Sequence, residues 1–175
     1  VSEEGGLYFT IVVRPDLPLM YAGLVNLAAA VDMAELLSSR YGTEAGLKWP
    51  NDILVHGKKI CGILSQMEAE GDHCIYLNIG MGLNVNNQTE SAEPGAVSLK
   101  SLLGRSVPRR EILIAFLDAF EKRMKNFDPA AVIAQWKLHN LTLGKRVRVV
   151  TVKETVEGLA VDLDKNGGLI LQLAD

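Results

Sequence analysis

Three neighbouring segments, "KWPND", "KKICGIL" and "NIGMGLNVNN", combine lysines, an acid, amides and glycines. The candidate residues are Lys48, Asn51, Asp52, Lys59, Gly62, Gly80, Gly82 and Asn84. A carboxylate that can hold Mg²⁺, beside a lysine that can hold an anion, is the combination that phosphate chemistry requires. From residue types and spacing alone, we therefore predict an anion site in an antiparallel sheet.

The glycines and the last asparagine add to this prediction. Gly62, Gly80 and Gly82 interrupt strand-like sequence, and glycine inside a strand often marks a bulge or a ligand close to the backbone. Asn84 could read the edge of a nucleobase, because its amide offers one acceptor and two donors. Each residue also has an ordinary explanation, since an Asn-Asp pair often forms a turn and a lone lysine is usually solvated. Spacing alone leaves both explanations open.

Two well-known nucleotide-binding patterns are excluded. "GMGLNVN" is not a G-x-G-x-x-G that opens a helix, and no G-x-x-x-x-G-K-[ST] is present. His56, His73 and His139 lack the spacing of metal ligands, so we interpret them as structural.

The candidate residues must be positioned by a meander of antiparallel strands. The first strand, "LKWPNDILVH", ends at Gly57, whose tolerance of positive φ suits a hairpin turn. "KKICGILSQMEAE" returns to a second turn at Gly71, and "HCIYLNIGMGLNVNN" returns again. We expect Asp52 and Lys59 to lie close together on one face. Because side chains alternate along a strand, Lys58 should point the other way.

Helices and a further strand surround this meander. "GGLYFTIVVRP" alternates like a buried strand, and Pro18 to Tyr41 has helical spacing that ends before Gly42. A second helix is expected after Ser106 as its N-cap, and a third from Asp128 and Pro129, with Val132, Ile133 and Trp136 facing inward. After Gly144, three short strands with turns near Lys153 and Asn166 predict a small β module.

The composition is that of an ordinary soluble globular protein, with 175 residues, 48% hydrophobic and 22% charged. The net charge of −3 gives no electrostatic case for nucleic acid. No continuous apolar run reaches the roughly 20 residues that span a bilayer, so we predict neither a membrane segment nor a signal peptide. The two cysteines, Cys61 and Cys74, favour inert thiols in a reducing cytosol.

At these motifs the sequence resembles the biotin protein ligases, the biotin–[acetyl-CoA-carboxylase] ligases. "KWPNDILVHGKKICGIL" resembles that family's K-W-P-N-D…K-x-x-G-I-L signature, and "NIGMGLNVNN" resembles its (I/V)-G-x-G-(I/L)-N-V-N segment. "GGLYF", "AVSL" and the Trp136 helix follow in matching order, and the module after Gly144 resembles the family's SH3-like C-terminal domain. The resemblance covers the whole chain.

The resemblance implies a reaction in two steps. Biotin's carboxylate attacks the α-phosphate of ATP to give biotinyl-5'-AMP and pyrophosphate, and a lysine of a biotin carboxyl carrier protein or domain then attacks the mixed anhydride. It also implies roles for single residues. Lys59 is catalytic and binds biotin with Gly62, Ile63, Leu64 and Gly80; Lys48, Asn51, Asp52 and Asn84 bind ATP; and Asp52 holds Mg²⁺.

The family pattern also includes segments outside this chain. A G-R-G-R-x-G-R-x-W loop is expected immediately before Val1, a Ser-Thr segment before that, and a final strand after Asp175. We therefore expect a piece of a longer ligase, and the chain carries no helix-turn-helix that would support a repressor role. An exposed strand edge is compatible with a homodimer.

We predict an α/β (α+β) fold, in which a mixed, largely antiparallel sheet packed with helices precedes a small SH3-like β module. Residues 1–142 would form the catalytic domain and residues 143–175 part of the C-terminal domain. The predicted function is ATP-dependent biotin ligation in the cytoplasm. The alternatives are a lipoate- or octanoate-type ligase or transferase, and a non-catalytic relative that binds a ligand or a partner.

Overall fold

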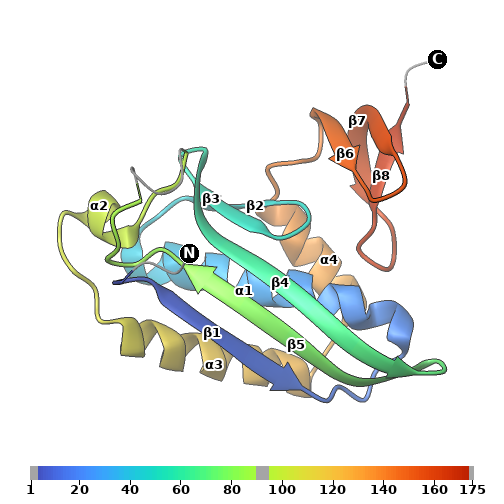
Figure 1. Ribbon diagram of the computed structural model, residues 1–175, viewed down its shortest axis with the longest axis horizontal. Coiled ribbons are helices and arrows are strands. Elements are labelled where there is room, and N and C mark those ends of the chain that lie inside the picture. The colour runs from blue at the N-terminus through green and yellow to red at the C-terminus, as the bar shows by residue number, and fades with distance from the viewer. Residues whose placement is uncertain (1–3, 90–94, 174–175) are drawn as a thin grey trace.

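The computed structural model describes residues 4–89 and 95–173 of the chain (Figure 1). Its strands are β1 (Leu7–Val13), β2 (Ala45–Lys48), β3 (Asp52–Val55), β4 (Lys58–Glu70), β5 (His73–Leu83), β6 (Arg146–Val150), β7 (Thr155–Leu163) and β8 (Leu169–Gln172). Its helices are η1 (Leu19–Tyr21), α1 (Ala22–Tyr41), α2 (Leu99–Leu103), α3 (Arg109–Lys125) and α4 (Pro129–Leu138). This combination confirms the predicted fold class.

The main sheet has five strands in the order β1-β5-β4-β3-β2, and each neighbouring pair is antiparallel. The predicted meander is therefore confirmed, with β1 added beside β5. The predicted β module is a separate three-stranded antiparallel sheet, β6-β7-β8. Parallel pairing in the described residues is limited to two single bridges, Leu47 with Asn140 and Lys59 with Ala96.

Helices cover one face of the main sheet and leave the other face open (Figure 1). Helix α1 packs on the covered face, and most of its side chains are buried. Alternation in β1 sends Leu7, Phe9 and Ile11 toward this core, while Tyr8 and Val12 lie on the open face. Because side chains alternate along every strand, each strand contributes one set of residues to the core and another to the open face.

The stretch Leu19–Tyr41 has the length and mean hydropathy, 1.3, of a membrane-spanning helix, alone among the described residues. However, 67% of that window is buried inside the protein. It passes this test although Asp32 and Glu35 interrupt its apolar sequence. The burial against the sheet is that of a core helix.

The hairpin turn at Gly57 forms as predicted. Val55 pairs with Lys58, and the two residues between them, His56 and Gly57, have φ values of 50° and 75°. Positive φ at both central positions is the type I′ turn, whose twist matches that of the strands it joins. The turn fixes which residues of β3 and β4 lie opposite each other.

Two predictions about the ends of elements were wrong. "KWPND" does not begin one strand: β2 ends at Lys48, β3 begins at Asp52, and a tight turn with a cis Trp49–Pro50 bond joins them. Ser106 does not cap the next helix, because Pro108 holds the N-cap position of α3. A serine does cap another helix, since Ser98 is the N-cap of the short helix α2 and exchanges hydrogen bonds with Ser101.

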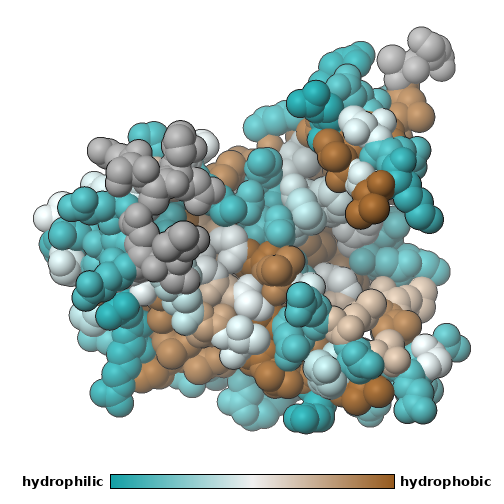
Figure 2. Space-filling view, in the orientation of Figure 1, coloured by the Kyte–Doolittle hydropathy of each residue, from teal (hydrophilic) through white to brown (hydrophobic). Residues whose placement is uncertain are grey.

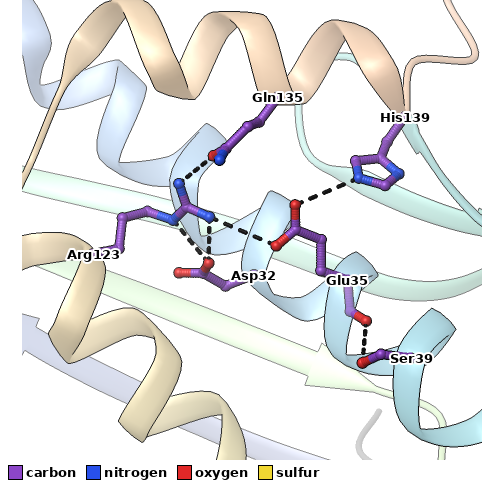
Figure 3. A network of polar contacts seen from close by, with 6 residues as sticks. All are labelled: Asp32, Glu35, Ser39, Arg123, Gln135 and His139. Atoms are coloured by element: carbon purple, nitrogen blue, oxygen red, sulfur yellow. Dashed lines mark hydrogen bonds and ion pairs between the residues drawn. The ribbon is translucent and has the colours of Figure 1, made fainter.

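A buried ionic contact ties the three long helices together (Figure 3). Arg123 of α3 donates to Asp32 of α1 from Nε at 2.7 Å and forms an ion pair from its Nη2 at 2.6 Å. The same guanidinium donates to Gln135 of α4. Glu35 lies 3.9 Å from Arg123 and 3.6 Å from His139. Burial raises the pKa of Asp32, and the hydrogen bond from Arg123 opposes that rise.

Candidate active site on the open face of the sheet

One row of paired residues crosses all five strands on the open face. Lys48 pairs with Asp52, Asp52 with Gly62, Gly62 with Gly82, and Gly82 with Tyr8. Because directly paired residues project to the same side of a sheet, the charged residues and the glycines form a continuous line. The sequence had placed most of this row correctly, although it assigned Lys48 and Asp52 to one strand.

The predicted proximity of Lys59 and Asp52 is confirmed. The ammonium Nζ of Lys59 lies 3.0 Å from Oδ1 of Asp52, and the two side chains are 34% and 20% exposed. Both members of the ion pair are thus partly exposed to solvent.

Gly62 makes room for this ion pair. A Cβ at position 62 would lie 3.1 Å from Cε and 3.3 Å from Nζ of Lys59, closer than most carbon contacts. A side chain at this position would therefore press on the end of the lysine, which would have to shift by a few tenths of an ångström. The interruption of β4 by glycine thus has a local cause, which is the passage of the Lys59 side chain across the sheet.

A β-bulge decides which of the two lysines reaches the open face. Leu54 pairs with Lys59 and Ile53 pairs with Cys61, so Ile60 is an extra residue in β4. The side chain of Ile60 is fully buried, while Lys59 shares the open face with Gly62. Bulges of this type re-aim side chains beside functional sites. The backbone of Lys59 is also held by Gly95 and Val97, at 2.9 Å and 2.8 Å.

The residues expected around biotin do not all face the same way. Leu64 pairs with Gly80 in the next row of the open face, and the Leu64 side chain is 64% exposed. Ile63 lies on the opposite side and is 1% exposed, so its side chain belongs to the core. Its backbone N–H donates to the Asn51 carbonyl at 2.9 Å, which ties the turn before β3 to β4. The side chain of Ile63 is therefore not available on the open face.

Hydrophobic side chains also gather on this face. Figure 2 shows hydrophobic atoms over the middle strands of the sheet, between hydrophilic regions. The exposed hydrophobic residues that the strand pairing places on this face are Tyr8, Val12 and Leu64. A ligand that combines an apolar part with an anionic part would match this neighbourhood of apolar residues and the Lys59–Asp52 pair.

Tyr8 is a candidate that the sequence analysis missed. Its ring lies across two glycines, because a Cβ at Gly6 would be 2.4 Å from Cε2 of the ring and one at Gly82 would be 3.3 Å from Cδ1. The side chain remains 42% exposed. Alternation along β1 places Tyr8 opposite the core residues, but a lone exposed tyrosine carries no signal of function in the sequence.

Asn84 follows the end of β5 in a well-ordered set of contacts. Its backbone N–H donates to the Ile60 carbonyl at 2.9 Å, and its own carbonyl accepts from Leu99 at 3.1 Å. Its side-chain Oδ1 accepts a hydrogen bond from Asn87 at 3.0 Å. This contact uses the acceptor of Asn84 and leaves its amide N–H₂ group as the part able to address a ligand.

Mg²⁺ is compatible with the residues present. No three His, Cys, Asp or Glu side chains gather into a metal site in the described part of the chain. Mg²⁺ is often bound by one or two carboxylates together with phosphate oxygens. Asp52 contacts Lys59 through Oδ1, and its carboxylate is of the kind that can serve as such a ligand.

The comparisons with protein families match two parts of the chain. The model described as the biotin/lipoate A/B protein ligase family matches residues 1–84. The model described as the biotin protein ligase C terminal domain matches residues 142–175. The first match contains Lys48, Asp52, Lys59 and Asn84, and the second contains the small three-stranded sheet.

Curated relatives agree with both matches. The bifunctional ligase/repressor BirA of Bacillus subtilis (strain 168) is 34% identical over 181 residues, which cover 98% of this chain and 55% of that protein. The biotin--[acetyl-CoA-carboxylase] ligase of Mycobacterium tuberculosis is 33% identical over 165 residues, covering 90% of this chain and 60% of that protein. The chain thus spans little more than half the length of these two relatives.

Solved structures share the fold. The apo biotin protein ligase from Aquifex aeolicus superposes with a TM-score of 0.81 at 27% identity, covering 97% of this chain and 76% of that one. The same Aquifex aeolicus ligase in complex with biotin and ATP gives a TM-score of 0.77 at 27% identity, covering 97% of this chain and 72% of that one.

Proposed function

The chain belongs to the biotin protein ligase family, and from that premise we propose that it carries the greater part of an ATP-dependent biotin ligase. The protein would activate biotin to biotinyl-5'-AMP and then transfer biotin to a lysine of a biotin carboxyl carrier protein or domain. The observation that carries this proposal is the Lys59–Asp52 ion pair above Gly62, at the edge of an apolar sheet face.

The first step needs cationic groups, because two anions must meet. Biotin's carboxylate oxygen attacks the α-phosphorus of ATP, and the bond to the pyrophosphate leaving group breaks. The ammonium of Lys59 stabilises the negative charge that gathers where carboxylate and phosphate approach. Lys48, which pairs with Asp52 across the β2–β3 turn, adds a second cation on the same face. Both lysines are oriented by strands, so little reorganisation is needed on binding.

The remaining residues bind and orient the two substrates. Gly80 leaves its strand bare, so a ring can lie against the backbone there, Gly62 leaves room for the Lys59 side chain, and Leu64 supplies an apolar wall. Asn84 would read the adenine through its N–H₂ group, and Asn51 lies beside Asp52 at the turn. Asp52 would hold Mg²⁺, which supplies charge neutralisation at the phosphates when bound.

In the second step the lysine amine of the carrier attacks the acyl carbon of biotinyl-5'-AMP. The amide bond forms, AMP leaves with the electron pair of the anhydride bond, and the amine loses a proton. Lys59, placed beside the same carboxyl group, can stabilise the charge that develops on the acyl oxygen.

The same proposal includes the domain bounds, the cellular location and the oligomeric state of the protein. We assign residues 1–142 to the catalytic domain and residues 143–175 to the C-terminal domain. A cytoplasmic location is supported by Cys61 and Cys74, which are both free and buried. A homodimer would use an outer strand such as β1, which ends the five-stranded sheet.

Biotin-dependent exchange of labelled pyrophosphate into ATP tests the proposed activity on the intact protein. We expect exchange with biotin and Mg²⁺, and a background rate without either. Exchange supported equally well by lipoate or octanoate would favour a lipoate-type ligase instead. No exchange with any of these acids, together with ligand binding, would favour a non-catalytic relative.

A further inference from the structure

Trp49 is held by two hydrogen bonds from the C-terminal part of the chain. Its backbone N–H donates to Oγ1 of Thr142 at 2.9 Å, and its indole Nε1–H donates to the Gly167 carbonyl at 3.0 Å. The two acceptors lie 93 and 118 residues further along the sequence. Both the backbone and the ring of Trp49 are therefore fixed by segments outside the sheet.

The first acceptor, Thr142, has a firmly held position. The residue is 6% exposed, and its own backbone N–H donates to Oδ1 of Asn140 at 3.2 Å. Leu143 donates to the same oxygen at 2.8 Å, while Nδ2 of Asn140 donates to the carbonyl of Lys137 at the end of α4. A buried hydroxyl on such a segment can hold its partner in one place.

The same segment lies along the edge of the main sheet. Leu47 of β2 donates to the His139 carbonyl at 2.7 Å, and its carbonyl accepts from Leu141 at 2.8 Å. Gly46 permits this approach, because a Cβ there would lie 2.6 Å from the Leu141 side chain. Residues 139–143, which we call the strap, therefore run beside β2 up to the turn that carries Trp49.

The second acceptor, Gly167, is fixed by a turn that rests on α1. Its φ is +86°, and a Cβ would lie 2.9 Å from side-chain atoms of both Leu24 and Leu27. Oδ1 of Asp164 accepts hydrogen bonds from two backbone N–H groups of this β7–β8 turn, at 2.8 Å and 2.9 Å. The small sheet thus reaches the main domain through a preformed turn with little free space.

These contacts act on the turn that joins the two charged ends of the site. Trp49 directly follows Lys48, and the pair of Lys48 with Asp52 closes the turn. Asp52 in turn carries the ion pair with Lys59. A displacement of the Trp49 backbone therefore shifts Lys48 and Asp52, the residues that we have assigned to Mg-ATP. The apolar face that we have assigned to biotin is affected less directly.

We infer that Thr142 is a positioning residue for the reaction: its hydroxyl, together with the Gly167 carbonyl, fixes the Trp49 turn and so makes the C-terminal module part of the active-site framework. This inference rests on the proposed function. Thr142 touches no substrate and acts through Trp49. Its position is also the first residue of the C-terminal domain match.

Steady-state kinetics on the intact protein test the role of the hydroxyl. Thr142→Val keeps the shape of the side chain and removes the acceptor, whereas Thr142→Ser keeps the acceptor. We expect Thr142→Val to raise the KM for Mg-ATP about tenfold, in line with the loss of one buried hydrogen bond, with the Kd for biotin unchanged. Thr142→Ser should restore the KM. Thr155→Val, the same change at an exposed threonine of β7, is the matched control.

The indole signals supply a readout that does not depend on activity. The chain has two tryptophans, Trp49 and Trp136, and Trp136 is buried on α4. Their indole N–H resonances can be assigned with Trp49→Phe. In Thr142→Val we expect the Trp49 resonance to shift and its hydrogen to exchange faster, while the Trp136 resonance stays in place and reports that the fold is intact.

Three results would overturn the inference. A wild-type KM for Mg-ATP in Thr142→Val, despite a shifted Trp49 resonance, would show a contact without a role in positioning. An equal loss in Thr142→Ser would show that the hydroxyl is not what matters. A Trp49 indole that exchanges freely in the unsubstituted protein would remove the contact with the Gly167 carbonyl, and with it the role of the C-terminal module in the framework. Absence of biotin-dependent exchange in a protein with a protected Trp49 indole would instead reject the proposed function.

Discussion

At the scale of single residues, Lys59 carries the sharpest prediction. Lys59→Ala removes the cation 3.0 Å from Asp52, so stabilisation of the transition state should fall by about 3 kcal/mol, or about 100-fold in rate. Lys58 lies opposite Val55 and away from the open face, so Lys58→Ala should be nearly silent. The rate of biotinyl-5'-AMP formation by the intact protein measures both effects.

The paired design separates a catalytic lysine from a turn that is merely basic. Equal losses in the two variants would mean that only the net charge of the hairpin matters. A loss confined to Lys58→Ala would show that the face assigned to the active site is wrong.

Asp52→Asn tests the role assigned to the carboxylate. An amide of the same shape keeps the turn but binds a divalent cation poorly, so use of Mg-ATP should weaken much more than binding of biotin. Turnover measured across a series of Mg²⁺ concentrations should show a higher Mg²⁺ requirement. Turnover at the wild-type level over the whole series would remove Asp52 from the metal site.

The sequence predicted the Lys59–Asp52 pair but could not show how it is achieved. If side chains alternate in regular pairs onward from the Gly57 turn, Lys59 lies on the same face as Asp52. If they alternate regularly backward from Gly62, Lys58 lies on that face instead. The bulge at Ile60 makes the first alternative correct. Nothing in "KKICGIL" marks a bulge, because Ile60 and Cys61 are apolar residues that fit a regular strand equally well.

At the scale of elements, Arg123 should decide how well three helices pack. Arg123→Met leaves Asp32, which is 5% exposed, without its ionic partner, and removing one member of a buried pair typically costs about 3–5 kcal/mol. Arg110→Met, an exposed change on the same helix, is the control and should have little effect on stability. Denaturant titrations give the free energies of unfolding.

A double variant identifies the cause of the stability loss in Arg123→Met. Adding Asp32→Asn to Arg123→Met removes the uncompensated charge, so part of the lost stability should return. If the double variant is no more stable than Arg123→Met, the loss comes from packing of the arginine side chain and not from the buried carboxylate.

Elements with strong local signals were predicted well, and those without them were not. Asp128 caps α4 as expected, since it accepts from Ala130 and Ala131 at 2.9 Å and 3.3 Å. The short helix α2 was missed, because Ser98 uses Ser101 as its capping partner where glutamate or glutamine is the usual signal. Pro50 inside the first predicted strand was the clue to the β2–β3 turn.

At the scale of the whole molecule, the open sheet face predicts the choice of ligand. The open face, with uncovered backbone at Gly80 and exposed Leu64 and Tyr8, offers a broad flat surface, which suits a fused ring better than a linear chain. We expect isothermal titration calorimetry on the intact protein to show tighter binding of biotin than of lipoate. Desthiobiotin, which lacks the second ring, should bind with intermediate strength.

Equal or tighter binding of lipoate would overturn the assignment to biotin. That result would favour the lipoate-type alternative, which the main fold alone does not exclude, because the family matched over residues 1–84 includes lipoate ligases by its description.

The contacts that join the two sheets could not be predicted from the sequence. The small β module was expected from its turns and alternating strands. The two hydrogen-bond partners of Trp49, however, lie 93 and 118 residues after Trp49 in the sequence. Local patterns such as periodicity and turn residues hold no information about which distant groups meet. The sequence therefore identified Trp49 as part of the "KWPND" motif but could not predict which residues contact it.

Because Ile60 is an extra residue in β4, the position of a one-residue deletion in the β3–β4 hairpin decides whether Lys59 stays on the face of Asp52. Deleting Ile60 would leave a regular ladder in which Lys59 still pairs with Leu54, although a buried side chain is lost. Deleting Lys58 would shorten the hairpin equally, yet Lys59 would then pair with Val55 and leave the face of Asp52. Two deletions of one residue each, at neighbouring sites, should therefore differ: the first protein keeps adenylation at reduced stability, and the second loses adenylation.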